Sequence, residues 1–196
     1  MKKIVIASGN QGKIREFKQM LEPEGYEVLT LKDLPDPVEP EETGTTFQEN
    51  AVLKAKAVTD RYGLEAIADD SGISIACLKE EPGIHSARWL GHDTPYDVKN
   101  AKVLELVDGH EDRTAHYSCA IAWCSPDREP VVFFDTWYGE IAKEPQGENG
   151  FGYDPIFYVP EAGKTAAQMT YEEKNAVSHR GKALRKLEAW LREQNN

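Results

Sequence analysis

Two adjacent carboxylates, Asp69 and Asp70, follow a short apolar run at residues 66–68 and precede Ser71 and Gly72. The apolar run predicts a buried strand, so both carboxylates are expected at a strand end. Carboxylate oxygens are hard ligands suited to Mg²⁺, and an unpaired carboxylate can accept a proton from an attacking water. Asp-Asp-Ser-Gly is also good turn chemistry, so partners elsewhere in the chain must decide between a metal site and a turn.

A second chemical cluster follows the N-terminal apolar run at residues 4–7. Residues 8–13, Ser-Gly-Asn-Gln-Gly-Lys, lead into a helical pattern over residues 14–21. A strand, a glycine-bearing loop and a helix start direct backbone N–H groups at an anion, and Lys13 adds a positive charge. Phosphate is the natural occupant. The G-x-x-x-x-G-K-[ST] pattern of a P-loop is absent, and an ordinary connection is the alternative.

Two late segments combine glycine, aromatic and charged residues. Residues 147–155 are Gly-Glu-Asn-Gly-Phe-Gly-Tyr-Asp-Pro, and residues 171–180 are Tyr-Glu-Glu-Lys-Asn-Ala-Val-Ser-His-Arg. Phe151 offers a flat face for a purine, and the glycines beside it allow the backbone to approach a ligand closely. Core packing is the alternative for Phe151 and Tyr153.

Lys174 and Arg180 are six residues apart in the second of these segments. On one continuous helix they would lie about 120° out of phase, so they can serve one pocket only if the helix breaks between them. Ser178 is a suitable N-cap for a new helix. His179 and Arg180 would then occupy its first turn, where they can face a ligand.

These motifs make the chain resemble the inosine triphosphate pyrophosphatase family, the pyrophosphatases of noncanonical purine nucleoside triphosphates such as XTP and dITP. The resemblance runs in order over about residues 3–190, and five motifs at matching spacing are highly specific although each alone is weak. The motifs are Ser8-Gly9-Asn10 with Lys13, Glu41 to Gly44 with Glu49-Asn50-Ala51, Ala68 to Gly72, Phe151 to Pro155, and Glu173-Lys174 with Ser178-His179-Arg180.

The resemblance implies that Asp70 accepts the proton of the attacking water and that Glu41 and Asp70 bind Mg²⁺. Hydrolysis between the α and β phosphates needs a metal to neutralise developing charge. Glu39 and Glu42 are neighbours, so the sequence leaves open which of the three glutamates faces the metal. The residues that the resemblance assigns to the substrate are Ser8, Gly9, Asn10, Gln11, Gly12, Lys13, Ser71, Phe151, Gly152, Tyr153, Asp154, Lys174, His179 and Arg180.

Other polar residues keep two interpretations. Glu49 and Lys54 lie on a helix predicted from about Thr46, where a helix cap or a solvated face competes with substrate contact. We place Asp69 behind Asp70 or at the strand end. His85 stands where the family usually has tyrosine, which leaves the role of that ring open.

The order of elements predicts an α/β fold. The resemblance implies an elongated mixed sheet with flanking helices in two lobes, with the nucleotide in a cleft between them, and one domain over residues 1–196. The predicted strands are 3–8, 26–30, 66–69, 73–78, 115–124 and 131–142, and the predicted helices are 12–22, 46–61, 95–107, 165–177 and 179–193.

Composition restricts the partners. The chain has 196 residues, 40% of them hydrophobic, and a net charge of −11, which opposes broad binding to nucleic acid. No apolar stretch approaches the roughly 18 residues of a membrane span, and no signal-peptide core follows Met1, so we expect a cytoplasmic protein. Three cysteines imply neither a disulfide nor zinc. A homodimer is what the resemblance implies.

Base recognition has a chemical logic. Hypoxanthine and xanthine present an acceptor at O6, whereas adenine presents an amino donor, so a site that offers only donors there rejects ATP. Arg180 and nearby backbone N–H groups are the expected donors. Two other classes are a sensor that binds a triphosphate without cleaving it and an enzyme that cuts at the γ-phosphate.

Overall fold

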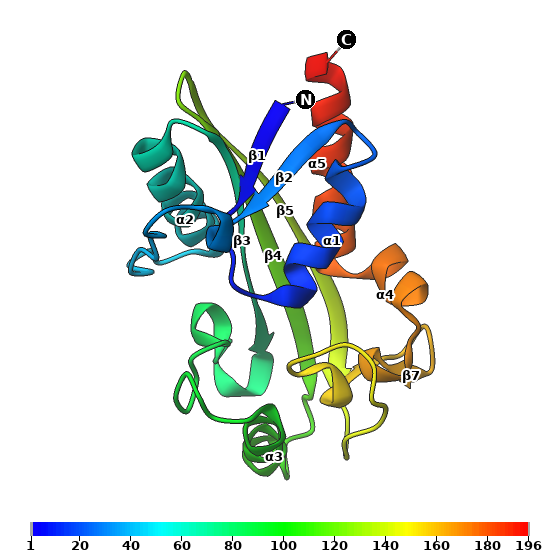
Figure 1. Cartoon of the computed structure of the whole chain (residues 1–196). Coiled ribbons are helices and arrows are strands. Elements are labelled where there is room, and N and C mark those ends of the chain that lie inside the picture. The colour runs from blue at the N-terminus through cyan, green and yellow to red at the C-terminus, as the bar shows by residue number, and fades with distance from the viewer. Residues whose placement is uncertain (1, 196) are drawn as a thin grey trace. The chain divides into compact units, whose positions relative to one another are not determined.

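The structure is a computed structural model that describes residues 2–195. Within these residues, seven strands form one mixed sheet in the order β2-β1-β3-β4-β5-β6-β7, accompanied by five α-helices, which confirms the predicted α/β class (Figure 1). The strands are β1 (Lys2–Ile6), β2 (Tyr26–Thr30), β3 (Glu65–Ile75), β4 (Thr114–Ser125), β5 (Arg128–Ile141), β6 (Phe157–Val159) and β7 (Lys164–Thr165). The helices are α1 (Gln11–Leu21), α2 (Phe47–Tyr62), α3 (Tyr96–Val107), α4 (Tyr171–Val177) and α5 (His179–Asn195).

The chain divides into two compact units, each assembled from separate stretches of sequence. The first unit comprises residues up to 70, residues 119–135 and residues from 183, and the second comprises residues 71–118 and 136–182. The boundary between the two units therefore falls between Asp70 and Ser71, inside the motif from Ala68 to Gly72. The single domain over residues 1–196 stays a prediction.

In the first unit, β1 pairs in parallel with both β2 and β3. Alternation along β1 sends Ile4 and Ile6 into a core cluster with α1 and α5, and Val5 and Ala7 into another with α2. Helices α1 and α5 accordingly run side by side on one face of this part of the sheet, with α2 on the other (Figure 1). Covering both faces explains why residues 4–7 are apolar without interruption.

The second unit has its own core. Ile73 and Ile75 of β3 pack in one cluster with Val103 and Val107 of α3 and with Phe157 of β6. Strands β5, β6 and β7 are paired antiparallel in succession. This unit therefore buries enough apolar surface to position the loops that carry its polar residues.

Two predicted elements were wrong. Residues 66–69 and 73–78 do not form two strands around a turn, because β3 runs unbroken from Glu65 to Ile75. Gly72 serves close packing instead, since a Cβ there would lie 2.3 Å from the carbonyl oxygen of Gly83. The helix predicted from residue 165 begins at Tyr171, because Thr170 caps it through its side chain.

Cys77, Cys119 and Cys124 are free thiols, and the last two lie in different core clusters of the first unit. Across residues 2–195, no helix combines the length and apolar character needed to cross a bilayer.

Candidate active site

The loop after β1 is organised by its own side chains. Asn10 caps α1, with Oδ1 accepting hydrogen bonds from the N–H groups of Gly12 at 2.9 Å and Lys13 at 3.2 Å. Ser8 Oγ accepts from the N–H of Asn10 at 3.2 Å. A phosphate bound here would take over N–H groups that these side chains now hold, while the positive end of α1 would favour its charge.

Lys13 faces the middle of β3, since Asp69 and Asp70 lie inside this strand and not at the expected strand end. Its ammonium lies 3.0 Å from Oδ2 of Asp69, whose side chain is fully buried. The two motifs that the sequence singled out, one after β1 and one within β3, therefore meet in the first unit. Asp69 has a defined role here, since its charge holds Lys13 beside Asp70.

Lys54 of α2 joins two further carboxylates. Its ammonium lies 3.2 Å from Oδ1 of Asp70 and 2.9 Å from Oε1 of Glu42. Burial raises the pKa of Asp70, although Lys54 opposes that shift. Burial also lowers the pKa of Lys54, but the charges of Asp70, Asp69 and Glu42 outweigh burial and raise it. Lys54 is therefore a permanent cation among carboxylates.

The donor set fits Mg²⁺. Asp70 is only 6% exposed, and its Oδ2 is buried without a hydrogen-bond partner among the described residues. Residues 2–195 hold no group of three or more His, Cys, Asp and Glu side chains arranged for a metal. Mg²⁺ usually binds through one or two carboxylates together with water and substrate phosphates, so Asp70 and one glutamate meet its requirement.

The structure favours Glu42 over Glu41 as that glutamate. Glu41 is exposed, whereas Glu42 is half-buried and shares Lys54 with Asp70. The assignment of Glu41 from the resemblance stays a prediction. The sequence could not choose among neighbouring glutamates, because choosing requires the path of the loop.

In the second unit, Phe151 is the exposed aromatic residue of the predicted base site. Its ring is 39% exposed, and the Lys174 ammonium and the Arg180 guanidinium carbon lie 4.8 and 5.4 Å from the ring centroid. Arg180 is 3% exposed and donates from Nη2 to Oγ of Ser71 at 3.0 Å. Lys174 and Arg180 thus lie over the Phe151 ring, and Ser71 joins the group through Arg180.

The predicted helix break makes this arrangement possible. Ser178 has an extended backbone, with φ −70° and ψ 159°, and separates α4 from α5. Its Oγ accepts from the N–H of Gly181 at 3.1 Å, as expected of an N-cap. Gly181 is required by close approach, because a Cβ there would lie 1.9 Å from the carbonyl oxygen of Asn175.

Asp154 lies inside this group of residues. It is 2% exposed, its Oδ1 accepts from the Tyr117 hydroxyl at 3.0 Å, and its Oδ2 accepts from the Phe151 N–H at 3.0 Å and from Lys174. Gly150 leaves room for it, since a Cβ there would lie 2.1 Å from Oδ2. The carboxylate of Asp154 therefore positions Phe151 and Lys174 within the protein.

Two other predicted substrate residues have buried side chains. Tyr153 is 3% exposed and donates its hydroxyl hydrogen bond to the Ser86 carbonyl at 2.6 Å. The ring of His179 stacks on Tyr117, with centroids 4.6 Å apart and planes 8° from parallel. The side chain of Tyr153 packs in the core cluster of the second unit, and its contact with the substrate stays a prediction.

Sequence reasoning left Glu42 open as a metal ligand and Lys54 open as a substrate contact, and it did not single out Tyr117. Lys54 had a usable signal, because it lies on the helix face next to the buried Ala51 and Ala55. Tyr117 had none, since its partner Asp154 is 37 residues away in the sequence.

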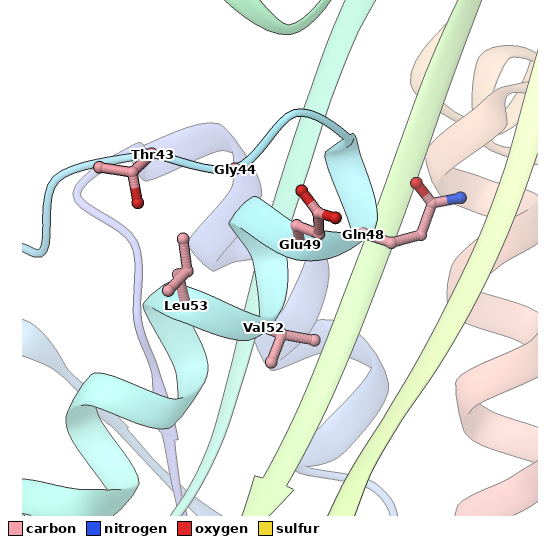
Figure 2. Close-up of a pocket in the computed structure, with 6 residues that line it drawn as sticks. All are labelled: Thr43, Gly44, Gln48, Glu49, Val52 and Leu53. Atoms are coloured by element: carbon pink, nitrogen blue, oxygen red, sulfur yellow. The ribbon is translucent and has the colours of Figure 1, made fainter.

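A hollow of about 460 Å³ lies elsewhere in the first unit. Figure 2 shows the loop with Thr43 and Gly44 beside the first turns of α2. None of the residues that the resemblance assigns to substrate or metal lines this hollow, although Glu49, which kept two interpretations, does. The lining residues are Thr43, Gly44, Gln48, Glu49, Val52 and Leu53.

Comparison with known proteins agrees with the sequence motifs. The sequence profile of the Ham1 family matches residues 4–190. A dITP/XTP pyrophosphatase of Geobacillus kaustophilus is 52% identical over 97% of this chain and 95% of its own length, and one of Exiguobacterium is 48% identical over 95% of both. The solved structure of the Staphylococcus aureus Ham1 protein aligns with a TM-score of 0.92 and 45% identity over 98% of this chain and 100% of its own.

Proposed function

Because this chain belongs to the Ham1 family, we propose that it hydrolyses noncanonical purine nucleoside triphosphates, namely ITP, dITP and XTP. The products are the nucleoside monophosphate and pyrophosphate, so the activity removes deaminated purines from nucleotide pools. The observation that carries the proposal is the buried Asp70, which has one unpartnered oxygen and shares Lys54 with Glu42. The names of close relatives support the substrate class.

The chemistry divides between the two groups of residues. Asp70 accepts a proton as water adds to phosphorus and the bond to the α–β bridging oxygen breaks. Lys13 and Lys54 stabilise charge on the phosphate oxygens, and N–H groups at the start of α1 bind them. A Mg²⁺ ion held by Asp70 and Glu42 would supply further charge neutralisation.

Base recognition belongs to the second group. Phe151 stacks on the purine, and Arg180 with backbone N–H groups donates to O6. Adenine places an amino group at that position, so its complex would leave donors facing donors. The resulting selectivity for ITP over ATP follows from an unpaired polar contact, which discriminates more strongly than shape alone.

Further properties belong to the same proposal. We propose Mg²⁺ dependence, a homodimer and a cytoplasmic location. The donor set at Asp70 supports the first, and the family resemblance supports the second. The net charge of −11 supports a small nucleotide rather than nucleic acid as the ligand.

Product analysis over a nucleotide panel tests the function. The protein is incubated with ITP, dITP, XTP, ATP or GTP and Mg²⁺, and the products are separated by anion exchange. We expect IMP and pyrophosphate from ITP, with no turnover once EDTA removes the metal. Orthophosphate with IDP would indicate cleavage at the γ-phosphate, and binding without products would indicate a sensor.

Paired glutamate variants test the metal assignment. We expect Glu42→Gln to raise the Mg²⁺ concentration for half-maximal activity by roughly tenfold or more, because a neutral amide is a poorer ligand. Glu41→Gln is the matched control and should stay close to wild type, since Glu41 is exposed. The opposite ranking would return the metal site to Glu41.

A further inference from the structure

The acidic loop, residues 37–43, is tied to α2 at both of its ends. Before it, the Tyr62 hydroxyl donates to the carbonyl oxygens of Pro35 at 2.9 Å and Asp36 at 2.7 Å. After it, Oδ1 of Asn50 accepts from the N–H of Gly44 at 2.8 Å. The loop that carries Glu42 therefore has defined anchors on one helix.

Asn50 is the buried anchor. It is fully buried, whereas Glu49, which accepts from the N–H of Thr45 at 2.7 Å, is exposed. The bond from Gly44 to Asn50 is partly buried, so it meets less competition from water than the exposed bond to Glu49. Gly44 also approaches too closely for any other residue, since a Cβ there would lie 2.6 Å from Oδ1 of Asn50.

Apolar contacts do not hold the loop in place of the hydrogen bond between Gly44 and Asn50. The hollow of about 460 Å³ lies between Thr43 and Gly44 of the loop and Val52 and Leu53 of α2 (Figure 2). Those side chains therefore do not fill the space beside the loop. The backbone at Gly44 depends on polar contacts for its position.

The amide of Asn50 has only one orientation. Its Oδ1 must face the N–H donor of Gly44, so Nδ2 is the amide atom on the other side. Nδ2 is buried without a hydrogen-bond partner among the described residues. Leaving a buried donor unpaired opposes stability. A side chain that served stability alone would not leave that donor unpaired, which points to a role for its oxygen.

Lys54 links this anchor to the site. It lies four residues after Asn50 on α2, hence on the same helix face, and it contacts both Glu42 and Asp70. Lys54 contacts the side chain of Glu42, whereas Asn50 accepts a hydrogen bond from the backbone N–H of Gly44, two residues after Glu42. A metal bound to the carboxylate oxygens would compete with the contact between Lys54 and Glu42. It would leave the hydrogen bond between Asn50 and Gly44 intact.

We propose that Asn50 is a positioning residue that fixes the backbone at Gly44 and thereby keeps Glu42 beside Asp70 for the metal. The inference rests on the metal-dependent hydrolysis proposed above. Asn50 itself touches neither substrate nor metal. Its effect should therefore appear in the metal requirement rather than in turnover at saturating metal.

Asn50→Ala tests the proposal. We expect the Mg²⁺ concentration for half-maximal ITP hydrolysis to rise roughly tenfold, the change expected for one buried hydrogen bond, with turnover at saturating Mg²⁺ within about threefold of wild type. Gly44→Ala attacks the same contact from the other side and should give a similar rise.

Two readouts do not depend on activity. In the metal-free protein, the Gly44 amide proton should exchange roughly tenfold faster in Asn50→Ala than in wild type, measured by NMR. Mn²⁺ binding followed by electron paramagnetic resonance should weaken by a similar factor. Thr59→Val is the matched control, since Thr59 is buried on the same helix but bonds to the Cys124 carbonyl, and it should change none of these values.

The outcomes separate the two proposals. A wild-type protein that does not cleave ITP overturns the proposed function, and the exchange and Mn²⁺ measurements then decide the role of Asn50. An active wild type with an unchanged Mg²⁺ requirement in Asn50→Ala overturns the positioning role alone. Unchanged exchange at Gly44, or an equal effect in Thr59→Val, overturns it as well.

Discussion

The Asp70→Asn variant is expected to hydrolyse ITP at least about 10²-fold more slowly than wild type while still binding the nucleotide. The amide cannot accept the proton of the attacking water, and it lacks the charge that favours a metal. The substitution keeps the size of the side chain, and Lys54 retains Glu42 as a partner at 2.9 Å, so the fold should persist. Steady-state turnover and calorimetric binding of ITP measure the two effects separately.

Asp69→Asn is the natural comparison, because it removes the neighbouring carboxylate on the same strand. Asp69 pairs with Lys13 at 3.0 Å. We expect this variant to raise KM for ITP, with a much smaller loss of turnover than in Asp70→Asn. Near-normal turnover in Asp70→Asn would contradict the assignment of Asp70 as the base. Equal losses of turnover in Asp70→Asn and Asp69→Asn would contradict a role that only Asp70 fulfils.

Arg180→Ala is expected to reduce the preference for ITP over ATP by roughly tenfold or more, as well as the rate. The guanidinium is buried, lies 5.4 Å from the centre of the Phe151 ring and donates to Ser71. Its removal takes away a donor for O6 and therefore relaxes the rejection of adenine. The ratio of kcat/KM for ITP and ATP measures the change.

Two further variants delimit this prediction. Arg180→Lys keeps the charge but not the planar fork, so part of the selectivity should be lost. Lys186→Ala removes a half-exposed cation of the same helix that pairs with Asp135, and it should leave the ratio unchanged. A wild-type protein that cleaves ATP as readily as ITP would contradict base reading at O6, whatever the result at Asp70.

Local rules in the sequence predicted most of the elements. Helix α2 was expected over residues 46–61 and spans Phe47–Tyr62, because Thr46 is an N-cap and Gly63 takes the left-handed conformation after its last turn. The break at Ser178 was also predicted, from the phase of Lys174 and Arg180. Such features depend on residues within a few positions of each other, so sequence alone specifies them.

The same rules failed where a segment distant in the sequence determines the conformation of the backbone. Asp-Asp-Ser-Gly has the composition of a turn, yet β3 continues through it, although its pairing with β1 covers only residues 65–67. Gly72 is explained by Gly83 and Ser86, which approach it from another part of the chain. No local pattern carries that information.

Residue types and their spacing predicted phosphate, a divalent metal and a purine as the ligands to expect, although the expected strand end at Asp69 and Asp70 proved to be the middle of β3. Tertiary structure decided the pairings: Lys13 with Asp69, Lys54 with Asp70 and Glu42, and Asp154 with Tyr117. The two kinds of interaction differ in the sequence separation over which they act. Caps and periodicity act over a few residues, whereas ion pairs and buried hydrogen bonds join side chains that only packing brings within about 3 Å of each other.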